Sequence, residues 1–188
     1  MKKKDFASLK PEEALHVAIF IEERNARMYE DFGQMFAPFR DKDSQEIAGA
    51  FREMANEERH HATVLMSRYL ERYNMAPCQV TDEDVKELIE LPQPNEEEYT
   101  LHHLRAGRAS RQRVLEMALA AETRARDFYL KLLKTTEDAE MRAVYTEMAQ
   151  FENEHEQFLR RRVALAKYAS DQGKPEGGQQ GGGGMAGA

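Results

Sequence analysis

Pairs of glutamate and histidine three residues apart are the features of this sequence with the clearest potential for chemistry. On a helix, residues three apart lie on one face, so a carboxylate and an imidazole at this spacing can bind one metal ion together. The sequence contains four such pairs: Glu13 with His16, Glu57 with His60, Glu58 with His61, and Glu152 with His155. The spacing alone is weak evidence, because a glutamate-rich sequence contains such pairs by chance.

The apolar pattern around each pair separates two of them from the others. Glu58 and His61 fill a gap in the apolar stripe of one helix, which consists of Phe51, Met54, Ala55, Ala62 and Leu65. Glu152 and His155 fill the equivalent gap in a stripe of Tyr145, Met148, Ala149 and Leu159. The other two pairs fall outside such stripes, and we expect them on the solvated surface.

Two further glutamates interrupt apolar stripes. Glu22 and Glu122 each follow a Leu-x-x-Ala pattern and precede a tyrosine, Tyr29 or Tyr129, which we expect to be a hydrogen-bonded core residue. All four stripe glutamates fall near the middle of a helical segment. Antiparallel packing would therefore gather four carboxylates and two imidazoles inside the protein, where unpaired ionised groups each cost several kcal/mol.

Divalent metal ions are the cations that suit this cluster. No lysine or arginine lies on the central stripes. Two divalent ions balance four carboxylates, and histidine with carboxylate is typical of iron or manganese. The sequence therefore predicts a dinuclear metal site made of Glu22, Glu58, His61, Glu122, Glu152 and His155.

Helix signals predict the elements that position these residues, and the composition predicts an all-α protein. We expect long helices over about 11–36, 43–73, 110–134 and 139–168, bounded by signals such as Pro11, Pro38, Pro77 and an Asp43 and Glu46 capping box. Short helices at 82–91 and 96–104 are expected in a long crossover between the second and third long helices. The domain organisation is an N-terminal extension (1–10), a four-helix bundle (11–168) and a disordered glycine-rich tail (169–188).

The bundle is expected to consist of two similar helical hairpins, because the chain repeats itself. Five residues recur 100 positions later, namely Leu15, Ala18, Glu22, Arg24 and Tyr29. Seven recur 94 positions later, namely Glu53, Met54, Ala55, Glu58, His61, Leu65 and Arg68. The repeats predict a bundle with approximate twofold symmetry and two metal positions of similar affinity.

These repeated motifs, Ala-x-x-x-Glu followed by Tyr and Met-Ala-x-x-Glu-x-x-His, resemble those of the rubrerythrin branch of the ferritin-like superfamily. The resemblance covers about residues 11–168. It implies a ferritin-like bundle with two iron ions, with manganese as an alternative, and with Glu58 and Glu152 as bridging ligands. It also implies an oxidoreductase that reduces peroxide or O₂ while oxidising Fe(II).

The sequence departs from typical rubrerythrins in two respects. A further carboxylate one turn from the third-helix ligand is missing, because Ala118, Leu119, Ala125 and Arg126 surround Glu122. A single cysteine excludes a rubredoxin centre, which needs four. The six-ligand set is also similar to that of bacterioferritin, but Arg59 occupies the position of that family's haem-ligating methionine, so we expect no haem.

Composition limits the partners and leaves several functions open. With 27 basic and 34 acidic residues the net charge is −7, which argues against nucleic acid, and no apolar run is long enough for a membrane span. Polar residues follow the basic start, so we expect a cytoplasmic protein.

An external electron donor and a homo-oligomer, with a dimer favoured, are expected. The alternatives are a ferroxidase that stores or sequesters iron, a di-iron hydroxylase, and a structural bundle without metal.

Overall fold

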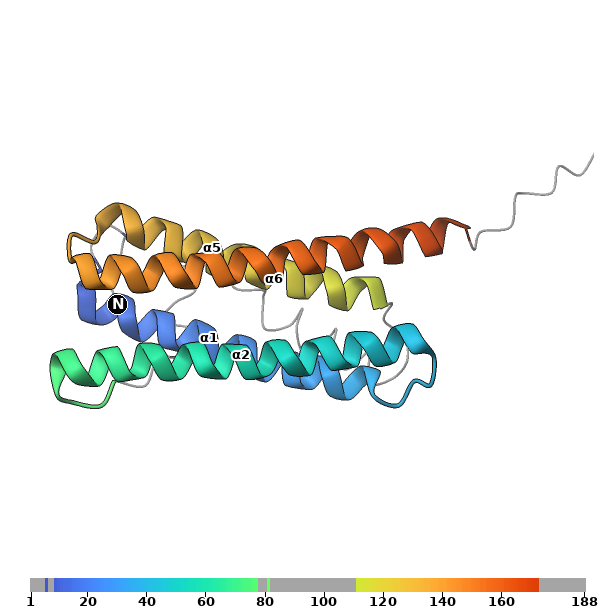
Figure 1. Ribbon diagram of the computed structural model, residues 1–188, viewed down its shortest axis with the longest axis horizontal. Coiled ribbons are helices and arrows are strands. Elements are labelled where there is room, and N and C mark those ends of the chain that lie inside the picture. Colours follow the sequence, from blue (N-terminus) through green and yellow to red (C-terminus); the bar gives the residue numbers. More distant parts are fainter. Residues whose placement is uncertain (1–5, 7–8, 78–80, 82–110, 173–188) are drawn as a thin grey trace, which may run out of the picture.

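Four long helices make up the fold. The structure, a computed structural model, describes residues 6, 9–77, 81 and 111–172, and over these residues it is helical with no strand. The helices are α1 (Pro11–Phe36), α2 (Lys42–Tyr73), α5 (Arg111–Thr135) and α6 (Ala139–Gln172). They run along a common axis, with α1 packed along α2 and α5 along α6 (Figure 1). The predicted all-α bundle of two helical hairpins is confirmed.

Parts of the prediction lie outside the described residues. These are the short helices at 82–91 and 96–104, the crossover that contains them, the glycine-rich segment from 173 onward, and most of the N-terminal extension. The last helix continues to Gln172, which is four residues beyond its predicted end. Among the described residues, no helix combines the length and the apolar character that crossing a membrane would require.

Side-chain caps fix where the helices begin. The Asp41 carboxylate accepts a hydrogen bond from the backbone N–H of Ser44 at 2.9 Å, so α2 begins at Lys42. The predicted cap, Asp43, is instead inside the first turn. Asp138 accepts from the N–H of Met141 at 2.9 Å and begins α6 in the same way.

The apolar core is divided into two clusters, one in each half of the bundle. One contains Leu15, Ile19, Leu65, Phe128, Tyr129 and Met148. The other contains Tyr29, Phe32, Phe51, Leu115 and Leu159. Each fully buried side chain of this size stabilises the fold by about 1.5–3 kcal/mol. In each helix, one of the four stripe glutamates lies between residues of one cluster and residues of the other. The bundle is therefore apolar on both sides of a polar middle layer.

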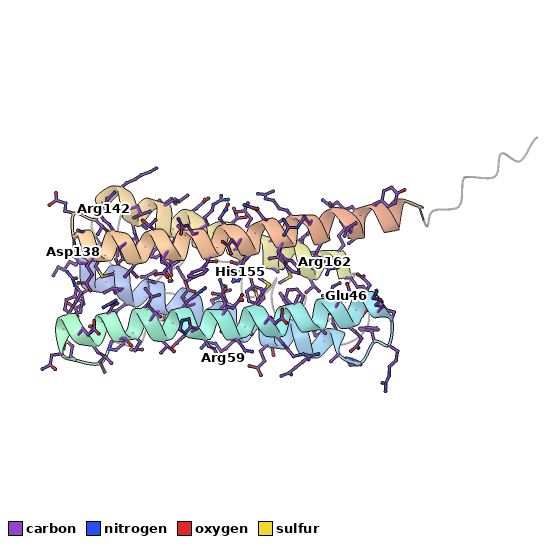
Figure 2. The ribbon with its side chains drawn as sticks, in the orientation of Figure 1. Glu46, Arg59, Asp138, Arg142, His155 and Arg162 are labelled. Atoms are coloured by element: carbon purple, nitrogen blue, oxygen red, sulfur yellow. The ribbon has the colours of Figure 1, made fainter. Side chains whose placement is uncertain are left out.

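Ion pairs between α2 and α6 join the two hairpins. Arg72, in the last turn of α2, pairs with Asp138, which precedes α6. Near the other end of α2, Glu46 lies 3.4 Å from Arg162 of α6 (Figure 2). Exposed pairs of this kind contribute at most about 1 kcal/mol each. Their positions show that α2 and α6 lie side by side and antiparallel, which brings their middles to the same level.

His16 differs from its prediction as a surface residue. It is only 9% exposed, and its ring lies against that of Tyr69 with centroids 4.6 Å apart. Burial lowers the pKa of its imidazole. The reason is that residues 14–22 are all buried, so α1 is covered on more than one face. An apolar stripe indicates one buried face of a helix and gives no sign that a second face is also covered.

Candidate metal centre

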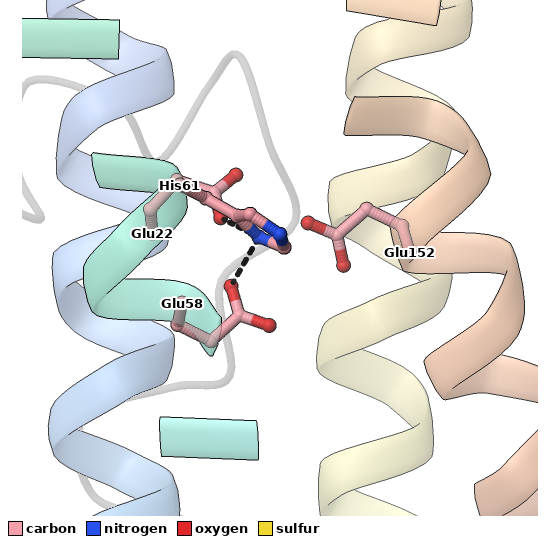
Figure 3. Close-up of side chains that lie close together, drawn as sticks. All are labelled: Glu22, Glu58, His61 and Glu152. Atoms are coloured by element: carbon pink, nitrogen blue, oxygen red, sulfur yellow. Dashed lines mark ion pairs between the residues drawn. The ribbon is translucent and has the colours of Figure 1, made fainter. Parts of the chain in front are cut away.

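The six predicted site residues lie together in the middle of the bundle. Each of the four helices contributes one glutamate, and α2 and α6 each add a histidine. All four glutamates are 0% exposed, and His61 and His155 are 3% and 9% exposed. The residues form two groups, each with ligand atoms within 4.8 Å of one another: Glu22, Glu58, His61 and Glu152 (Figure 3), and Glu58, Glu122, Glu152 and His155. Glu58 and Glu152 belong to both groups.

The two histidines face the shared carboxylate of Glu58 from opposite sides. His61 Nδ1 lies 3.8 Å from Glu58 Oε2 and 3.3 Å from Glu22 Oε2. His155 Nδ1 lies 3.0 Å from Glu58 Oε1 and 3.6 Å from Glu122 Oε2. Each oxygen of Glu58 is therefore associated with a different histidine, which is the arrangement that a bridging carboxylate requires.

Two buried tyrosines hold the unshared glutamates across the hairpins. The Tyr29 hydroxyl of α1 donates to Glu122 Oε1 of α5, and the Tyr129 hydroxyl of α5 donates to Glu22 Oε1 of α1. Burial, with the nearby carboxylates, raises the pKa of both phenols well above its ordinary value. The hydroxyls therefore stay protonated and act as donors. Each hydrogen bond occupies one carboxylate oxygen and leaves the other facing the cluster.

Replacing either tyrosine with phenylalanine is expected to lower the free energy of unfolding by about 1.5–3 kcal/mol, because a buried hydrogen bond to a charged group is lost. Urea unfolding at pH 7 measures this. Tyr145→Phe is the matched control, since Tyr145 is 2% exposed but its hydroxyl bonds to none of the described residues. Equal losses in Tyr29→Phe and Tyr145→Phe would contradict the role given to the hydrogen bond.

The buried polar atoms without a hydrogen-bond partner form a metal-ligand set. Within the described residues, the site contains eight of them: Glu22 Oε2, both carboxylate oxygens of Glu58, His61 Nδ1, Glu122 Oε2, both carboxylate oxygens of Glu152, and His155 Nδ1. Leaving such atoms unpaired costs about 1–3 kcal/mol each, and more for charged groups. They divide evenly into two sets of three carboxylate oxygens and one imidazole nitrogen. These residues therefore fit two divalent metal ions bridged by two carboxylates.

Protons balance the charge of this cluster when no metal is bound. Burial, followed by the carboxylates of Glu22 and Glu122, raises the pKa of Glu58 to about 8. Burial and three carboxylates raise that of Glu152 well above its ordinary range. Burial alone would lower the pKa of the histidines, but adjacent carboxylates outweigh it and raise that of His61 to about 9 and that of His155 to about 11. Metal ions would replace these protons.

Comparison with protein families identifies the family of the chain. The family model for rubrerythrin matches residues 13–110 and 113–176, which is most of the chain. The chain belongs to the rubrerythrin family. No match was found among curated proteins or among solved structures. In this rubrerythrin-family chain the buried cluster fits a di-iron site, and the resemblance seen in the sequence motifs is confirmed.

One contact to the cluster has no signal in the sequence. Glu57 was expected on the solvated surface with His60, and both are exposed. However, Glu57 Oε2 lies 2.7 Å from His155 Nε2, the ring nitrogen on the far side from the cluster. No signal within α2 indicates this contact, because His155 comes from the other hairpin.

Proposed function

We propose that this chain is a di-iron oxidoreductase that reduces peroxide or O₂ with electrons from an external donor. Six residues would hold the iron pair: Glu22, Glu58, His61, Glu122, Glu152 and His155. Manganese is the alternative metal. The observation that supports the proposal is the division of eight unpaired buried atoms into two equivalent ligand sets. Without metal, only bound protons and the contacts between histidines and carboxylates offset the charge of these atoms.

The iron pair, when bound, supplies two electrons, one from each Fe(II), which matches the two-electron reduction of hydrogen peroxide to water. The protein's part is to fix and insulate the pair. Glu58 and Glu152, which belong to both groups, would provide an oxygen to each metal position, while Tyr29 and Tyr129 orient the unshared glutamates. The apolar clusters on both sides limit the entry of water, which strengthens the electrostatic interactions within the site.

Two cavities among the described residues lie away from the metal-ligand cluster. The described part of the chain has a cavity of about 510 Å³ on the α1 and α2 pair, lined by residues such as Glu23, Arg59 and Met66. A second, of about 330 Å³, lies at the end of the bundle near Asp138. None of the six site residues lines either cavity. A hydroxylase would need a pocket for its organic substrate beside the metal ligands, and neither of these two cavities supplies one.

Anaerobic loading with Fe(II) and rapid mixing with hydrogen peroxide test the proposal. About two Fe(II) per chain should be oxidised, with one peroxide and two protons consumed and two waters released. Mass measurement in solution with iron analysis separates this function from storage. A dimer with two irons per chain supports an oxidoreductase, and a shell of many copies holding hundreds of irons per chain would support storage instead.

Restoring the carboxylate that typical rubrerythrins carry near the third-helix ligand should change the reaction rate. Ala125 is buried one turn from Glu122 and on the same face, so Ala125→Glu would place an additional anionic group beside the site. We expect faster oxidation of the Fe(II)-loaded protein by peroxide, measured by stopped-flow absorbance. An unchanged or slower rate with two irons still bound would show that the missing carboxylate does not limit this protein.

A further inference from the structure

The two histidines of the site differ in which residue of the opposite hairpin contacts the ring. His155 Nε2 lies 2.7 Å from the Glu57 carboxylate of the opposite hairpin. The ring of His61 instead stacks on Phe151, also from the opposite hairpin, with centroids 4.7 Å apart and planes at 24°. Within the described residues, no carboxylate contacts His61 Nε2. Among the described residues, one histidine therefore has an anionic partner at Nε2 and the other has an aromatic partner on its ring face.

This difference breaks the internal symmetry of the chain at one position. Glu57 and Phe151 are equivalent in the repeat, because each immediately precedes a shared glutamate, Glu58 or Glu152. Each also contacts the histidine of the other hairpin. Each hairpin therefore packs one residue against the histidine of the other hairpin. One of these residues is a carboxylate and the other is a phenyl ring. The other ligand atoms of the two groups match one for one.

We infer that the two metal positions are unequal, and that Glu57 is a positioning residue that makes the Glu122 and His155 position the tighter one. This inference rests on the proposed function. Metal binding through Nδ1 requires the imidazole proton to be on Nε2, and a carboxylate that accepts this N–H fixes the tautomer and the ring orientation. It also makes Nδ1 a stronger ligand. Phe151 restrains the plane of His61 but accepts no such hydrogen bond.

The expected difference between the positions is about tenfold in affinity. Loss of a carboxylate behind a metal-binding histidine typically weakens metal binding by about 10–100-fold. The Glu57 side chain is 57% exposed, so water screens its charge and the lower end of this range applies. The sequence repeats predicted similar metal affinities at the two positions. The inference instead predicts that two metal ions bind in two separate steps.

Anaerobic titration of the metal-free protein with Co(II), followed by calorimetry and visible absorbance, tests the inference. Co(II) occupies sites of this kind without needing an oxidant, so binding is measured apart from activity. The wild-type protein should bind two Co(II) in steps separated by about tenfold. Glu57→Gln should weaken only the tighter step by about tenfold, so that the steps merge while two ions still bind. Phe151→Glu should tighten the weaker step.

Glu53→Gln is the matched control, because Glu53 is an exposed glutamate one turn earlier on the same helix. It removes the same charge and should leave both steps unchanged. A loss confined to one step distinguishes positioning of His155 from a general loss of stability. Equal affinities in the wild type, or two steps that Glu57→Gln leaves unchanged, would overturn the inference while the di-iron proposal stands. A wild-type protein that binds no pair of ions would overturn the proposed function itself.

Discussion

Replacing Glu58 with glutamine is expected to abolish binding of the metal pair while the helical bundle stays folded. Both oxygens of Glu58 are buried, and each lies beside a different histidine. Glutamine keeps the size of the side chain but cannot carry the charge that bridges two cations. Without metal, the raised pKa of about 8 keeps Glu58 protonated at neutral pH, so the uncharged amide is a close replacement.

Metal analysis per chain after anaerobic loading, together with circular dichroism, measures both parts of this expectation. Glu53→Gln again serves as the control, since it removes an exposed carboxylate from the same helix and should keep two metals per chain. Two metals bound to a folded Glu58→Gln protein would show that the site is misplaced.

The metal-free protein is expected to lose stability as the pH rises from about 5 to 9. Folding raises the pKa of Glu58 from 4.5 to about 8, and that of His61 from 6.5 to about 9. In this range the folded protein therefore holds protons that the unfolded chain has released, and stability falls as they are lost. One pKa unit corresponds to about 1.4 kcal/mol, so these two groups together account for a decrease on the order of 8 kcal/mol.

The metal-loaded protein should behave in the opposite way over this range. The metal takes the place of the protons, so its affinity, and the stability that it confers, rise as the ligands are deprotonated. Urea unfolding at pH 5, 7 and 9, with and without Mn(II), measures both trends. Glu58→Gln should flatten the slope of the metal-free protein. A metal-free stability that is constant or increases with pH would contradict the charge balance described for the cluster.

The sequence alone was sufficient for the helical bundle and for gathering the six site residues. The reason is that both depend on periodicity along single helices. Glu58 and His61 could be assigned to the interior because they fill a gap in an apolar stripe. Glu22 and Glu122 could be assigned to the same site because the repeat places them at equivalent positions along their helices. Two independent copies of the same pattern made the prediction specific.

Contacts between helices were not predictable in this way. A stripe shows which face of a helix is buried, but it does not show which residue of another helix lies opposite. The contact of Glu57 with His155 and the exchange of tyrosine hydrogen bonds between the hairpins are therefore structural findings. His16 was misassigned for a related reason, because the stripe does not show how many faces of α1 are covered.

Anomalous diffraction at the iron edge from crystals loaded anaerobically with Fe(II) is the most direct test of the di-iron site. We predict two anomalous peaks per chain, roughly 3.5–4 Å apart, as is typical of two-metal sites. One peak should lie beside Glu22 and His61, the other beside Glu122 and His155, with Glu58 and Glu152 between them. A single peak, no peak, or peaks at exposed residues such as His60 would contradict the account.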